Sequence, residues 1–196
     1  FLGWGLKPPD AVLLADEIAG SAVLKNLSVA YNSISGDAAQ QLAAAALSRK
    51  SLEVLSEVPI KELREDKLTE LDLRDKGLGP TEGIVLGELV KGSAVLTSLN
   101  LDFNQIGPEG AKAIADALAS GSAVLTSLNL GSNSIKDEGA VAISESLKSN
   151  RSLETLNLRF NDIGSTGAKA LAAALREGGS AVLTSIDVGY NQLDEE

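Results

Sequence analysis

One arrangement of apolar and polar residues returns along the chain at intervals of about 28 positions. Leucines stand at the first, fourth and sixth positions of a copy and asparagine at the ninth, as in Leu96, Leu99, Leu101 and Asn104. The copies begin at Leu24, Leu52, Leu68, Leu96, Leu125, Leu153 and Leu183. The spacings lie between 28 and 30 residues except for one of 16. Self-similarity at such a period predicts a solenoid in which each copy forms one layer.

Each copy predicts a strand followed by a helix. The apolar alternation around residues 99–101 has the period of two that is typical of a strand buried on one face. Residues 110–118 and 167–175 place apolar side chains at i, i+3, i+4 and i+7, which predicts helices with one apolar face. The asparagine stands where the chain must turn, and its amide can hydrogen-bond backbone groups there. Stacked layers would form a parallel sheet with helices on its other side.

This repeat resembles that of leucine-rich repeat proteins. The period and the helix sequence G-A-x-A-[IL]-A-x-A-L, found at 110–118 and 167–175, are similar to the ribonuclease-inhibitor-like class. That class also occurs in the sensor domains of NOD-like receptors and in Ran GTPase-activating proteins. The resemblance covers residues 6 to 193 and implies one α/β solenoid domain over 1–196, with about seven repeats. Its parallel strands are expected on the concave side and its helices on the convex side. The resemblance implies no particular partner, because this scaffold serves many.

The pattern fails between residues 52 and 67. Val58-Pro59 stands where a strand should continue, and proline cannot donate to a sheet. We expect an irregular short unit here, which is either a degenerate repeat, the interpretation we favour, or a binding loop. The next unit has Lys76 in place of its asparagine. Both ends of the sequence stop within a repeat, so we expect a part of a longer chain.

Composition argues against several classes of function. The chain has no cysteine and no histidine, which removes the usual thiolate nucleophiles, zinc ligands and neutral-pH proton carriers. Its net charge of −10, with scattered basic residues, disfavours nucleic acid. No segment has the ~20 apolar residues needed to insert in a membrane. Residues 102–107 match the start of an EF-hand loop but lack its final glutamate. We expect no catalytic residues, cofactor or metal, and an intracellular, cytoplasmic location.

The two positions before each asparagine vary from layer to layer. They hold Ala30-Tyr31, Arg74-Asp75, Asp102-Phe103, Gly131-Ser132, Arg159-Phe160 and Gly189-Tyr190. Four of the six aromatic residues (one Trp, two Tyr, three Phe) therefore fall in one slot. Aromatic residues and arginine dominate the energetics of protein interfaces. An alternative, equally weighted, is that these rings pack against the next layer as part of the scaffold.

We therefore predict a partner-binding surface on the concave face. It comprises Tyr31, Asp72, Arg74, Asp75, Asp102, Phe103, Arg159, Phe160, Asp187 and Tyr190. Asp72 and Asp187 belong to the slot between the strand leucines, which is polar in every layer and suits a basic or polar partner. The leading hypothesis is a non-enzymatic scaffold that binds another protein. Two alternatives stay open: a structural subunit of a larger complex, and a GTPase activator in which Arg74 assists phosphate chemistry.

Overall fold

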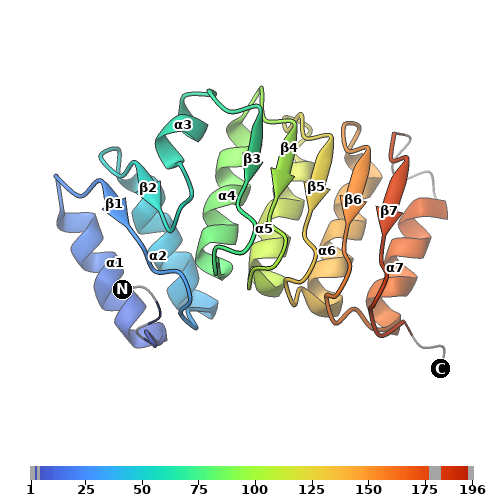
Figure 1. Cartoon of the computed structure of the whole chain (residues 1–196), viewed down its shortest axis with the longest axis horizontal. Coiled ribbons are helices and arrows are strands. Elements are labelled where there is room, and N and C mark those ends of the chain that lie inside the picture. Colours follow the sequence, from blue (N-terminus) through green and yellow to red (C-terminus); the bar gives the residue numbers. More distant parts are fainter. Residues whose placement is uncertain (1–2, 4, 177–181, 194–196) are drawn as a thin grey trace.

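The chain alternates short strands and helices throughout the computed structural model, which describes residues 3, 5–176 and 182–193 (Figure 1). The helices are Pro8–Gly20 (α1), Gly36–Ser48 (α2), Ile60–Arg64 (α3), Pro80–Gly92 (α4), Gly107–Ala119 (α5), Lys136–Ser149 (α6) and Ser165–Arg176 (α7). The strands are Asn26–Leu27 (β1), Val54–Leu55 (β2), Glu70–Asp72 (β3), Ser98–Asn100 (β4), Ser127–Asn129 (β5), Thr155–Asn157 (β6) and Ser185–Asp187 (β7). We expect both end repeats to be incomplete. Part of that expectation falls on residues 1–2, 4 and 194–196, which lie outside the described residues.

The strands form two parallel sheets. Strands β3 to β7 pair in chain order, whereas β1 and β2 form a separate two-stranded sheet. In the larger sheet Leu71, Leu99, Leu128, Leu156 and Ile186 lie opposite one another in register. Because each strand presents the same repeat position to its neighbour, residues that vary between layers form rows across the sheet.

The repeated leucines fill the space between the strands and the helices. Leu99 and Leu128 from the strands are buried, as are Ile114 and Ile143 from the helices opposite them. Neighbouring helices need about 8–10 Å, whereas neighbouring strands need only about 4.8 Å. A stack of such layers must curve, with the strands on its concave side. Figure 1 shows the row of strands lying on one side of the row of helices.

The asparagines join each layer to the one before it. Asn104 accepts hydrogen bonds at Oδ1 from the backbone N–H groups of Lys76 and Leu78, at 3.1 and 3.0 Å. Its Nδ2 donates to the Leu73 carbonyl of the same preceding layer, at 2.9 Å. Asn133, Asn161 and Asn191 make equivalent bonds. Buried turn backbone would otherwise lack partners, so the asparagines satisfy the loops between the layers.

The unit at 52–67 contributes one short strand and a five-residue helix. After β2 the backbone turns through Ser56 and Glu57, both with positive φ, and Val58 pairs back on Leu55. Arg64 of α3 then donates to carbonyl groups at the end of α2, including Leu47 at 2.7 Å and Arg49 at 3.0 Å. The short helix thus caps α2 instead of adding a full helix to the convex row.

Candidate functional site

The residue just before the asparagine position, which Lys76 occupies in one unit, has a left-handed backbone in the six units that contain this turn. The φ angles are 58° at Tyr31, 54° at Asp75, 56° at Phe103, 53° at Ser132, 53° at Phe160 and 56° at Tyr190. This conformation favours glycine, asparagine and aspartate, and it is costly for a bulky side chain. Aspartate suits the position, whereas the four aromatic residues are poorly suited to it. The turn geometry therefore does not explain why aromatic residues stand there.

Four of the predicted residues form a cluster at the C-terminal end of the concave face. The rings of Phe160 and Tyr190 stack with centroids 4.4 Å apart and planes 13° from parallel. The guanidinium of Arg159 lies 4.8 Å from the Tyr190 centroid and 5.7 Å from that of Phe160. Asp187 holds the same guanidinium through a 3.2 Å contact. Phe160 and Tyr190 nevertheless remain 51% and 69% exposed, so their rings form a fixed, open platform.

The other two rings differ in how much the scaffold holds them. The Tyr31 ring lies across Gly77, where an added Cβ would approach it to 2.4 Å, and its hydroxyl donates to the Asp75 carbonyl at 3.3 Å. Phe103 is 59% exposed, and its ring neither stacks on another ring nor lies under a cation within the described part of the chain. Packing against the next layer therefore accounts in part for Tyr31 and Phe160, and not for Phe103.

Arg74 and Asp102 bind each other across two layers. The Asp102 carboxylate accepts hydrogen bonds from Nε and from Nη2 of Arg74, at 3.1 and 2.6 Å. Hydrogen bonding to this carboxylate, together with its negative charge, raises the pKa of Arg74 above its ordinary value. Asp102 is 7% exposed, and the absence of a side chain at Gly131 leaves room for its carboxylate. Asp102 was predicted to face a partner, but the structure places it beneath Arg74, where it positions that side chain.

In strands β3 to β7, the side chain in the polar slot between the strand leucines accepts a hydrogen bond from the backbone N–H two residues later, where the strand ends. Asp72 Oδ1 accepts the Arg74 N–H at 3.0 Å, and Asp187 Oδ1 accepts the Gly189 N–H at 2.9 Å. The same contact is made by Oδ1 of Asn100, Asn129 and Asn157, each of which accepts the backbone N–H of the residue two positions later. The slot is polar for this structural reason, although Asp72 is also exposed to solvent. The repeat pattern alone did not reveal this role; the two-residue spacing typical of Asx turns could have indicated it.

The described residues contain no group of three acidic side chains that could hold a metal ion. In the segment that resembles an EF-hand start, Asp102 faces Arg74, and Asn104 is engaged between the layers. Across the same described ranges, no helix is long and apolar enough to cross a membrane.

Known proteins share the repeat and its arrangement. A leucine-rich repeat family model matches residues 92–115, 121–144 and 149–172, which belong to the regular units. No curated protein matches the chain. Among solved structures, the actin-binding site 2 of leiomodin-1 aligns with a TM-score of 0.62 and 23% identity, over 68% of this chain and 79% of that one. An internalin from Listeria monocytogenes aligns with a TM-score of 0.42 and 21% identity, over 91% of this chain and 45% of that one.

At such identities the likeness to leiomodin-1 bears on the fold alone, and it agrees with the strands, helices and register described above. The predicted α/β solenoid is confirmed. Domains built from these repeats generally mediate protein–protein interaction. The chain folds as a leucine-rich repeat solenoid, and three of its units match the leucine-rich repeat family model.

Proposed function

We propose that the protein is a non-enzymatic scaffold whose concave face holds another protein. The observation that carries this proposal is the placement of Tyr31, Phe103, Phe160 and Tyr190 at left-handed backbone positions with their rings about half exposed or more. Each such residue costs on the order of 1–2 kcal/mol relative to a conformation with negative φ. Strain of this kind is typical of functional sites, and exposed aromatic residues are the side chains that anchor interfaces.

The chemistry around these rings favours a polar or basic partner. Asp72 and Asp75 are exposed beside the Arg74 and Asp102 pair, and Arg159 and Asp187 flank the C-terminal rings. A partner that supplies basic groups toward Asp72 and Asp75 and a flat apolar group toward Phe160 and Tyr190 would complement both ends. Because the rings and the ion pairs are already fixed to one another, little ordering is required on binding.

The GTPase-activator alternative finds less support. Arg74 was the candidate side chain for phosphate chemistry, but its guanidinium is bound to Asp102 through two hydrogen bonds. We also infer that the chain belongs to the ribonuclease-inhibitor-like class and acts in the cytoplasm. The offset of 28 or 29 residues between paired strands β3 to β6 and the absence of cysteine support these two inferences.

The test is a crosslinking and binding experiment. A photoreactive phenylalanine derivative placed at Phe103 or Tyr190 is expected to capture a partner in cell extract, and one placed at Lys169 on α7 is not. The captured protein is then purified and titrated against the variants Phe103→Asn, Phe160→Asn and Tyr190→Asn. Asparagine tolerates positive φ, so the fold is retained. At least one substitution is expected to weaken binding about 30-fold or more, as hot-spot residues do.

Lys169→Asn, an exposed change on the convex side, serves as the control. Unchanged affinity for all three concave variants, with intact circular dichroism spectra, would show that the partner binds elsewhere.

A further inference from the structure

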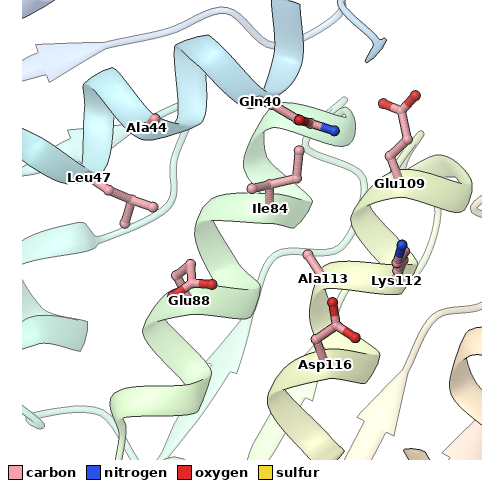
Figure 2. Close-up of a pocket in the computed structure, with 9 residues that line it drawn as sticks. All are labelled: Gln40, Ala44, Leu47, Ile84, Glu88, Glu109, Lys112, Ala113 and Asp116. Carbon is pink, nitrogen blue, oxygen red and sulfur yellow. The ribbon is translucent and has the colours of Figure 1, made fainter. Parts of the chain in front are cut away.

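A second recessed surface lies on the convex side, away from the concave face. A cavity of about 530 Å³ opens between α2, α4 and α5. Its apolar lining comes from Ala44 and Leu47 of α2, Ile84 of α4 and Ala113 of α5 (Figure 2). Both its volume and its mixture of apolar lining and polar rim are in the range of protein binding sites. We call these residues, with the polar rim described below, the convex groove.

The irregular unit explains why the groove exists. The helix α3 has five residues, whereas each of the remaining helices that follow a strand has 12 to 14 residues. The row of long helices therefore passes from α2 directly to α4, and these two helices pack less extensively than α4 does on α5. The space that an additional long helix would fill is left partly open on the convex side.

Hydrogen bonds at both ends of α2 fix one wall of the groove in place. At the start of α2, both carboxylate oxygens of Glu109 from α5 accept the Gly36 N–H, at 2.8 and 3.0 Å. At the end of α2, Arg64 donates to the carbonyls of Leu47 and Arg49. Because both ends of α2 are fixed to other elements, the groove is open before any partner arrives, which lowers the ordering cost of binding.

The lining residues follow helical spacing along each wall. Ala44 and Leu47 continue the row begun by Gln40, and Ile84 and Glu88 are four residues apart. A row from i to i+7 extends about 10 Å along a helix axis. The groove therefore matches about two turns of a partner helix lying against α2, α4 and α5, in the manner of other helix-in-groove complexes.

The rim carries excess negative charge. Glu88 and Asp116 border the groove, and neither makes an ion pair within the described residues. One cation, Lys112, lies beside them, and the third carboxylate, that of Glu109, is engaged at Gly36. Figure 2 shows Glu88 and Asp116 on neighbouring helices, and the apolar residues on the three helices that line the groove. A partner that brings aliphatic side chains flanked by Lys or Arg would be complementary to this rim.

We propose that the convex groove is a second docking site, which binds an amphipathic helix with an aliphatic stripe and basic flanks, presented by a partner protein. The site shares no residue with the concave surface. Its success or failure is therefore measured separately from the function proposed above.

The probe is a synthetic, hydrocarbon-stapled helix of about 14 residues with leucines at i, i+4 and i+7 and lysines on either side. Fluorescence polarisation is expected to give saturable binding with a Kd below about 100 µM, weakening as salt is added. Amide resonances of Ala44, Ile84 and Ala113 are expected to shift in ¹⁵N spectra, whereas those of Phe103 and Tyr190 are not. The same helix with glutamates in place of the lysines should bind at least about tenfold more weakly.

Variants of the protein complete the test. Ala44→Arg projects a long cation into the groove from an exposed helical position and should weaken binding at least about tenfold. Gln41→Arg places the same side chain on α2 outside the groove and should leave binding unchanged. Replacing Glu88 and Asp116 together by Gln and Asn should weaken binding and reduce its salt dependence.

Several results would overturn the proposal. These are absence of binding at about 1 mM probe, resonance shifts that map to the concave face, or equal affinities for Ala44→Arg and Gln41→Arg. Circular dichroism of each variant keeps a loss of fold from being mistaken for a loss of the site.

Discussion

Phe103 combines a backbone angle of 56° with a ring that is 59% exposed. Its position in the turn would be occupied with less strain by Asn or Gly. The ring, in turn, gains little from burial, since most of it faces solvent. At the scale of single residues, the scaffold is therefore slightly destabilised at the place where we expect recognition.

Replacing Phe103 by Asn should stabilise the isolated protein. Relief of the left-handed strain is expected to raise the free energy of unfolding by about 1 kcal/mol, as measured by urea denaturation. Phe103→Ala is the matched comparison, because alanine removes the ring but keeps much of the strain; it should give no such gain. A loss of stability in the Asn variant would support the alternative that the ring packs as scaffold.

The sequence was sufficient to locate this slot but not to interpret it. The register of the repeats placed Tyr31, Phe103, Phe160 and Tyr190 at equivalent positions, and the structure gives them one backbone conformation. The positive φ could not be anticipated from aromatic residues, since these are rarely found there. The burial of Asp102 also escaped prediction, because it depends on Gly131 in the following layer and on Arg74 in the preceding one.

Among the helices, α4 differs from its neighbours in the residue that faces the preceding helix. Gly110 and Gly139 hold this place in α5 and α6, where an added Cβ would approach Ile106 or Ile135 to less than 3 Å. In α4 the equivalent residue is Glu82, which is 2% exposed. Its carboxylate accepts the Gly79 N–H at 2.8 Å and interacts with Ser56 of the irregular unit. The irregular unit thus allows a side chain where the regular packing requires glycine.

Burial raises the pKa of Glu82 above its ordinary value of 4.5, despite the hydrogen bond that its carboxylate accepts from Gly79. The folded protein therefore binds this proton more tightly than the unfolded chain. The resulting stability is fully present below pH 4.5 and is lost as the pH rises through the elevated pKa. Glu82→Gln should keep the neutral contacts and remove this decline, so that the variant is at least as stable as the parent at pH 8.

Urea denaturation across pH 4 to 9 checks the difference, with the exposed Glu88→Gln of the same helix as control. Parallel stability curves for the parent and Glu82→Gln would mean that Glu82 has the same pKa in the folded protein as in the unfolded chain.

Regular strands and helices were predictable because each copy repeats the same local pattern, and the helices predicted at 110–118 and 167–175 lie within α5 and α7. The conformation and contacts of residues 52–67 were not predictable in this way. The turn at Ser56 and Glu57, the cap that Arg64 provides to α2 and the contact with Glu82 all join residues distant in sequence. No local period encodes such contacts, so the convex groove that results from them could not be predicted either.

The whole molecule is held by two sheets of unequal size. The pair β1 and β2 is separate from the five strands β3 to β7. Stability in repeat proteins is approximately a sum over layers and their interfaces. We therefore expect the N-terminal part to open more readily than the centre of the larger sheet.

Native-state hydrogen exchange tests this expectation, because it measures the opening free energy at each amide. The amides of Leu101 and Leu130, which donate to the next strand, should exchange with opening free energies at least about 1 kcal/mol above those of Val29 and Val54. Leu158, which donates to Asp187 in the last described layer, controls for fraying at an end. Equal protection of all these amides would show that the junction at the irregular unit transmits full cooperativity.

The asparagine bonds also bear on the order in which the layers are completed during synthesis. Each asparagine serves the layer before its own: Asn133 accepts from Ile106, Asn161 from Ile135, and Asn191 from Ile163. A loop leaving the ribosome thus remains unsatisfied until the asparagine of the next repeat emerges, 26 to 28 residues later. At ~5–20 residues per second this is a delay of about one to six seconds. During synthesis, folding would accordingly lag behind chain elongation by one layer, and the most recently made loop would be the one that still lacks its asparagine hydrogen bonds.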